Sequence, residues 1–160
     1  MPAANLPGDR VADRLGVLEQ AYGSFPVNQT TLSVSADAYD RARERYSEGL
    51  ADVYVQVYDE TDDVLLVERT NGWAVPRVEP GVDDRLETGT RRNLAARTGV
   101  ECRLVDLKRA TILGVRDGGD PDRDPVYRLV TVFAAEHTGG SPRDGAAWHT
   151  DLPDSTLPGH

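Results

Sequence analysis

The sequence predicts an α+β protein, because segments typical of strands and segments typical of helices both recur along its 160 residues. Residues 53–58 are rich in β-branched and aromatic side chains, which strands favour, and residues 64–69 and 126–135 are further strand-like segments. Residues 9–22 instead carry apolar side chains at spacings of four, three and four, the period of an amphipathic helix. A chain of this length suits a single domain with a sizeable core.

The first fifty residues predict a helix, a strand and a second helix. The first helix begins near Asp9, a favourable N-cap, and ends at Gly23. Residues 29–35 alternate as a strand does, and the charged segment 37–47 has the thin apolar stripe of a surface helix. We interpret this segment as an extension that packs on the following domain; the alternative is that it helps a homodimer to form.

The middle of the chain predicts a β-hairpin. Residues 53–58 and 64–69 are its two strands, and the polar residues 59–63 supply the turn between them. The second strand leads directly to Trp73 and Pro76, which close this strand region.

The last third predicts further strands separated by loops. Residues 101–116 alternate weakly and predict one long strand or two short ones. Residues 118–125 form a polar loop with two prolines, and 126–135 give the strongest strand of the chain. Residues 138–145 predict a turn-rich loop, and 146–153 a closing strand and turn.

An acidic loop and a short helix lie between the hairpin and these last strands. The loop contains Gly81, and Gly99 marks the end of the helix. On its own this segment predicts an amphipathic surface helix. Its inward-facing side chains recur every four residues at Leu86, Thr90 and Leu94.

The stretch from Gly72 to Val100 resembles the Nudix box, loosely Gly-x5-Glu-x7-Arg-Glu-x2-Leu-x-Glu-Glu-x-Gly-Val, introduced by Trp-x-Leu-Pro-Gly-Gly. The residues that agree are Trp73, Pro76, Arg92, Leu94, Thr98, Gly99 and Val100, with Asp84 at the loop glutamate. The resemblance covers roughly residues 52–158. It implies an α/β/α sandwich with a mixed β-sheet flanked by helices, in which residues 1–50 are an N-terminal extension and residues 51–160 the Nudix-like domain.

Nudix proteins hydrolyse nucleoside diphosphates linked to another moiety, and glutamates hold their magnesium ions. Here Asn93, Ala96 and Arg97 stand where the family carries glutamates, and Arg77 and Val78 replace its paired glycines. Positions 93 and 97 share one face of a helix. Magnesium needs oxygen ligands, and a guanidinium at this face would repel it. We therefore expect magnesium-dependent hydrolysis to be impaired.

The first functional hypothesis is a binder of a nucleotide or another phosphate-containing ligand. Its ligand-binding candidates are Arg77, Arg92, Arg97 and Trp73. The fork of Arg97 could hold a phosphate directly, while the resemblance implies that Arg92 orients the Asp84 carboxylate. The alternative for Arg97 is an ion pair with Asp84 or Glu101, and the alternative for Trp73 is a place in the core.

The second hypothesis is an active Nudix hydrolase, a pyrophosphohydrolase whose acidic loop supplies the metal ligands that the helix lacks. Its catalytic candidates are Asp84 and Glu87, and its metal candidates are Glu79, Asp83 and Asp84. This hypothesis requires Mg²⁺ or Mn²⁺, whereas the first requires no cofactor. The alternative for the acidic cluster is a solvated surface.

Composition narrows the range of partners. The net charge is −9, the pI is near 4.7, and Lys108 is the one lysine among 18 basic residues. Such a surface opposes general binding to nucleic acids or anionic membranes. Acidity combined with a preference for arginine resembles the proteins of halophiles, and the alternative is an acidic mesophile protein.

The remaining sequence features exclude several kinds of site. Cys102 is the only cysteine, which excludes an internal disulfide. The three histidines are scattered and give no metal triad. No apolar run reaches membrane-spanning length, and the first residues lack a signal-peptide core, so we expect a cytoplasmic location.

Overall fold

The structure, a computed structural model, describes residues 7–48, 51–70, 72–80 and 85–152, with the backbone alone at 7–14 and 46–48. The helices are α1 (Pro7–Tyr22), α2 (Ala36–Glu48) and α3 (Leu86–Thr98). The strands are β1 (Val27–Val34), β2 (Ala51–Tyr58), β3 (Val64–Arg69), β4 (Gly72–Ala74), β5 (Arg77–Val78), β6 (Val100–Asp117), β7 (Val126–Gly140) and β8 (Ala146–His149).

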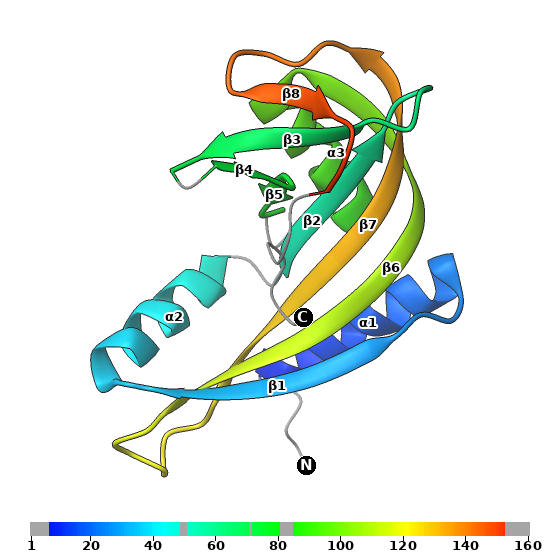
Figure 1. Cartoon of the computed structure of the whole chain (residues 1–160). Helices are drawn as coiled ribbons and strands as arrows, with labels where there is room; N and C mark the ends of the chain where they lie inside the picture. Colours follow the sequence, from blue (N-terminus) through cyan, green and yellow to red (C-terminus); the bar gives the residue numbers. More distant parts are fainter. Residues whose placement is uncertain (1–6, 49–50, 71, 81–84, 153–160) are drawn as a thin grey trace.

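Among the described residues, eight strands form one sheet in the order β1-β6-β7-β2-β3-β4, with β5 beside β2 and β8 beside β3 (Figure 1). β1 pairs parallel with β6, and β2 pairs parallel with β7. The other pairings are antiparallel. The predicted α+β class, with a mixed sheet flanked by helices, is confirmed.

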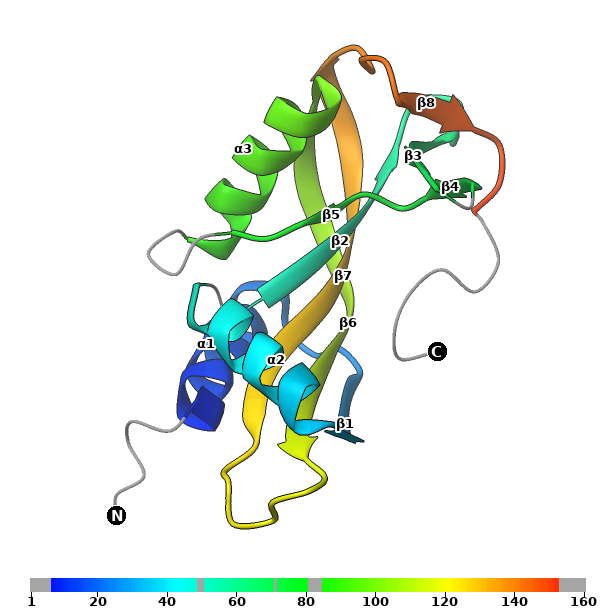
Figure 2. The same ribbon diagram turned by 90° about the vertical axis from the view of Figure 1, so that its left-hand side faces the viewer.

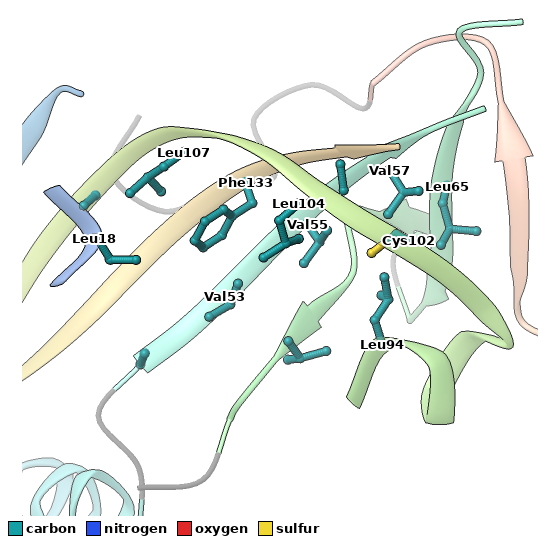
Figure 3. Packing of buried hydrophobic residues seen from close by; sticks show 14 of the residues in the cluster. Leu18, Val53, Val55, Val57, Leu65, Leu94, Cys102, Leu104, Leu107 and Phe133 are labelled. Carbon is teal, nitrogen blue, oxygen red and sulfur yellow. The ribbon is translucent and has the colours of Figure 1, made fainter. Parts of the chain in front are cut away.

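Helices α1 and α3 lie on the same side of this sheet (Figure 2). Leu18 of α1 and Leu94 of α3 belong to the main buried cluster, where they join Val53, Val55 and Phe133 of the central strands (Figure 3). The middle strand β2 is buried on both faces along most of its length, as expected for a strand with parallel pairing and covered faces. In the part of the chain that is described, no helix is long and apolar enough to cross a membrane.

Helix α2 packs on a second, smaller cluster. Its Tyr39 is buried with Val115 of β6 and Val126 of β7. Arg123, from the loop between those strands, lies 4.2 Å from the centre of the Tyr39 ring and pairs with Asp40 at 2.8 Å. The helix is therefore held by apolar contacts and by the long loop that the sequence predicts.

The segment before residue 50 shows the predicted order of helix, strand and helix, and β1 pairs with β6 along its whole length. Helix α1 begins at Pro7 instead of Asp9, and it ends as predicted before Gly23, where φ is +76°. The backbone N–H of Gly23 donates to the Glu19 carbonyl at 2.9 Å. The boundary between residues 50 and 51 stays a prediction.

One predicted loop is partly wrong. The loop placed at residues 138–145 is shorter, because β7 continues to Gly140 and pairs there with Val100. Gly140 has φ of +73°, and a Cβ there would lie 2.1 Å from the Gly99 carbonyl oxygen. Two glycines therefore let the strands approach closely at this point. Residues 101–116 lie within the single long strand β6.

Candidate functional site

Strands β4 and β5 precede helix α3 in the chain, and β5 pairs with the central strand β2. The Val55 N–H donates to the Pro76 carbonyl at 3.1 Å, and Val78 pairs with Val53 of β2. This mixed sheet, with the box helix between β5 and β6, is the Nudix-like arrangement that the resemblance implies. The acidic residues 83 and 84 lie outside the described residues, so the expected pair of Arg92 with Asp84 stays a prediction.

Helix α3 has one buried stripe and two polar flanks. The stripe consists of Thr90, Leu94 and Thr98, which agrees with the four-residue spacing predicted at residues 90 and 94, and Gly89 is buried beside it. At 100° per residue, Asn93 and Arg97 lie on one flank, and Arg91 lies on the opposite flank. Gly99 ends the helix with φ of +81°, and its N–H donates to the Ala95 carbonyl at 2.9 Å.

At the three helix positions where the resembled family carries glutamates, 93, 96 and 97, the described chain has no carboxylate. Arg97 Nη1 donates to the Arg77 carbonyl oxygen at 2.7 Å. Asn93 Nδ2 donates to the Gly89 carbonyl of its own helix, also at 2.7 Å. The contact of Arg97 is thus to a backbone carbonyl and not to Glu101, which was one of its two expected partners.

A cleft of about 180 Å³ adjoins this flank. Its charged lining consists of Arg69, Arg77, Arg97, Glu68 and Asp144. Among the described lining residues there are thus three guanidiniums and two carboxylates, and Arg77 also pairs with Glu79 at 3.5 Å. It is bounded by α3, β3, β5 and the loop before β8.

The metal candidate Glu79 is held in an ion-pair network. Its Oε1 lies 2.8 Å from Arg45 and 3.5 Å from Arg77, and its Oε2 lies 3.3 Å from Arg128. Arg128, whose side chain is only 1% exposed, also binds Asp52 through two contacts of 2.8 and 3.0 Å. Both oxygens of Glu79 are therefore neutralised by arginines.

The catalytic candidate Glu87 is also engaged. Its Oε2 accepts a hydrogen bond of 3.0 Å from the Tyr22 hydroxyl, which links α3 to α1. Burial, followed by this bond to Glu87, raises the pKa of Tyr22, so the phenol stays protonated. The two residues line a mainly apolar cavity of about 610 Å³ between the helices, together with Phe133. Within the described ranges, which exclude 81–84, no three His, Cys, Asp or Glu side chains are grouped to hold a metal ion.

The four ligand-binding candidates do not share one site. Arg77 and Arg97 line the cleft described above, whereas Arg92 lines a different cavity on the far flank of α3. Trp73 packs on His149 with ring centres 4.6 Å apart and contacts the buried cluster of Val64, Leu66 and Val75. Trp73 is half-buried beside this cluster, and its role as a ligand-binding residue stays a prediction.

Several charged residues of this region were not found from the sequence. Arg69 and Asp144 line the cleft, and Arg45, Asp52 and Arg128 form the network around Glu79. Arg128 carries a signal that the sequence does contain, since it is the only charged residue within the apolar run 126–135. The others lie in polar segments that offer no such signal.

No known family model matches the sequence, and no curated protein matches it. Solved structures do resemble the chain. A UDP-X diphosphatase is 15% identical over 73% of this chain and 63% of its own length, with a TM-score of 0.49. An ADP-ribose pyrophosphatase from Streptococcus suis is 14% identical over 68% and 80%, with a TM-score of 0.46. A MutT protein from Bacillus halodurans is 18% identical over 62% and 67%, also with a TM-score of 0.46.

The match to the UDP-X diphosphatase spans less than two thirds of that protein. Sequence identities of 14–18% show a likeness in backbone fold alone. None of these likenesses says what the present chain binds or hydrolyses.

Proposed function

We propose that this chain is a Nudix-like scaffold that binds a phosphate-containing ligand, such as a nucleotide, without magnesium-dependent turnover. One observation carries the proposal: the guanidinium of Arg97 donates to the Arg77 carbonyl at 2.7 Å, on the helix flank where the resemblance implies metal-binding glutamates. A fixed positive charge thus stands where a metal-dependent enzyme needs negative charge.

The size of the electrostatic effect supports this assignment. A divalent cation about 4 Å from a guanidinium is repelled by about 8 kcal/mol at an effective dielectric constant of 20, twice the value for two unit charges. Neither the Asn93 amide, bound within its own helix, nor the Ala96 methyl group offsets that repulsion. Magnesium also leaves its water shell reluctantly. The helix flank therefore disfavours a metal ion.

The same charges suit a phosphate. Arginine presents several N–H donors in a planar fork that matches phosphate oxygens, and its contact with the Arg77 carbonyl uses one of them. Arg69 and Arg77 line the same cleft and supply further positive charge. Its volume of about 180 Å³ has room for a group of a few heavy atoms with bound water.

The test combines turnover and binding, measured on folded protein with a panel of nucleoside diphosphate derivatives. We expect no turnover with or without Mg²⁺ or Mn²⁺, and calorimetric binding that is indifferent to magnesium and to Asp84→Asn. Arg97→Gln should weaken binding about tenfold, the loss of one charge-assisted hydrogen bond. Arg116→Gln, the same change of charge at an exposed position at the end of β6, is the matched control.

The active-hydrolase hypothesis predicts the opposite results. Turnover that requires magnesium and disappears in Asp84→Asn or Glu87→Gln would replace the proposed function with catalysis by the acidic loop. Absence of both turnover and binding across the panel would also contradict the proposal. Equal binding by the Arg97→Gln and Arg116→Gln variants would remove Arg97 from the site.

A further inference from the structure

A second cationic cavity lies on the flank of α3 opposite Arg97. It has a volume of about 440 Å³ and is lined by Arg91 and Arg92 of the helix, Arg143 of the loop after β7, and Glu101 of β6. The helical positions that line it, 88, 91, 92 and 95, share one face, which turns away from positions 93 and 97. The cavity is thus separate from the Arg97 cleft.

Two of these guanidiniums are anchored by backbone acceptors. Arg91 Nε donates to the Cys102 carbonyl at 3.0 Å, and Arg143 Nη1 donates to the Ala96 carbonyl at 2.9 Å. The backbone N–H of Arg143 also donates to the Thr98 carbonyl at 2.8 Å. Each guanidinium has five N–H donors, so one contact fixes it and leaves others for the cavity that it lines.

The loop after β7 lies near the C-terminal end of α3 (Figure 2), and Arg143 of this loop is held there by its contacts with Ala96 and Thr98. The close approach depends on Gly99, because a Cβ at that position would lie 2.9 Å from Arg143 Cγ. Arg143 also offsets the partial negative charge of the helix C-terminus, which would otherwise disfavour an anion. Arginines held in place before binding lose little conformational entropy when a ligand arrives.

The arginines that line the cavity outnumber its described acidic residue, Glu101. Among the lining residues that the structure describes, the two anchored arginines alone exceed the single glutamate, 2 − 1 = +1, on a chain whose net charge is −9. Burial raises the pKa of the Cys102 thiol to about 11, against a smaller lowering by Arg91, so this lining residue adds no negative charge near neutral pH. From the anchored guanidiniums and this excess we propose that the cavity binds a small phosphate-class oxyanion, independently of the Arg97 cleft.

The experiment titrates the full chain, in metal-free buffer, with inorganic pyrophosphate, while assigned backbone amide signals are followed by NMR. We expect the amides of Gly99, Glu101 and Cys102 to shift together with one dissociation constant. Arg91→Gln should weaken that binding about tenfold. Glu101→Gln should strengthen it severalfold, because it removes the carboxylate that repels the anion.

Two controls make the test specific. Arg116→Gln has the same change of charge as Arg91→Gln and should leave the dissociation constant unchanged. Arg97→Gln should leave the shifts of Gly99 and Cys102 unchanged, so failure of the first cleft and failure of this cavity are told apart.

Three outcomes would overturn the inference. If the amide shifts were spread over the whole surface, pyrophosphate would be acting by general charge screening, without a specific binding site. A dissociation constant in Glu101→Gln equal to that of the unmodified chain would show that this cavity does not hold the anion. Loss of all shifts in Arg97→Gln would show that pyrophosphate occupies the first cleft alone.

Discussion

At the scale of single residues, the most consequential side chain is the buried Arg128. It lies on β7, is 1% exposed, and binds the Asp52 carboxylate of β2 through two contacts of 2.8 and 3.0 Å. Glu79 after β5 and Arg45 of α2 complete the network. A buried guanidinium costs several kcal/mol in lost hydration unless it is paired. The pairing therefore holds the segment after β5 against the central strands β2 and β7.

Replacing Arg128 with methionine should destabilise the fold. The Asp52 carboxylate would keep only longer contacts to Arg45 and Arg77, at 3.5 and 3.9 Å. We expect the free energy of unfolding to fall by about 3 kcal/mol, the lower end for a broken buried pair. Denaturation in urea measures the change.

The matched double variant sharpens this prediction. Arg128→Met combined with Asp52→Leu removes both buried charges, and it should recover a large part of the lost stability. Arg116→Met is the exposed control and should cost less than about 0.5 kcal/mol. If Arg128→Met alone proved as stable as that control, the network would have no role in stability.

At the scale of elements, the end of helix α3 connects both candidate sites. Arg97 lies in its last turn, and Gly99 follows with φ of +81°. The next residues of the chain begin β6, while Arg143 is held against the same turn by its contact with Ala96. The left-handed turn and the absence of a side chain at Gly99 are both required for this packing.

Gly99→Ala tests that requirement, with Gly23→Ala as its control. Both glycines have similar φ, +81° and +76°, but an added Cβ meets nothing within 4 Å at Gly23. At Gly99 it would lie 2.5 Å from the Ser141 carbonyl oxygen. We expect Gly23→Ala to cost about 1 kcal/mol from backbone strain alone. Gly99→Ala should cost about 2–3 kcal/mol more, as overpacking does.

Thermal and chemical denaturation of both variants give this difference directly. The Gly99→Ala variant should also show altered amide signals for Arg143 and Glu101, because the loop must move to admit the methyl group. Equal destabilisation of the two variants would mean that the loop relaxes freely and does not position Arg143.

At the scale of the whole molecule, the first fifty residues contribute to the same sheet as the box. β1 covers the edge of β6 from Ala110 to Asp117, and Leu18 of α1 packs with Leu107 and Phe133 (Figure 3). Arg45 of α2 reaches the residue that the sequence offered as a metal ligand, Glu79. An extension that only rests on a finished domain would not supply a strand.

Deleting residues 1–50 should therefore prevent stable folding of the remainder. The deletion exposes an edge of β6 and the apolar side chains beneath α1, both of which favour aggregation. Size-exclusion chromatography and circular dichroism should show aggregated or unfolded protein. A soluble truncated chain with an unchanged unfolding midpoint would instead show that residues 51–160 fold by themselves, and would support the boundary predicted from the sequence.

The local patterns of the sequence determined much of the fold. The apolar run that opens residues 64–69 predicts β3 with its observed bounds, and Gly23 and Gly99 end helices where glycine permits a left-handed turn. The spacing along α3 likewise places Arg97 and Asn93 together on one flank of the buried stripe. These features depend on neighbours a few residues away, so periodicity and backbone freedom are enough to predict them.

Only the tertiary structure decided which charges meet. Glu79 binds Arg128 and Arg45, which lie 49 and 34 residues away in the sequence (128 − 79 and 79 − 45), and Arg97 bonds to a backbone carbonyl. Trp73 packs on His149 because β3 pairs with both β4 and β8. Such contacts follow from strand order and register, and a shift of register by one residue would move every side chain to the other face. Local sequence patterns carry no record of that register, because it is set by the packing of the whole sheet.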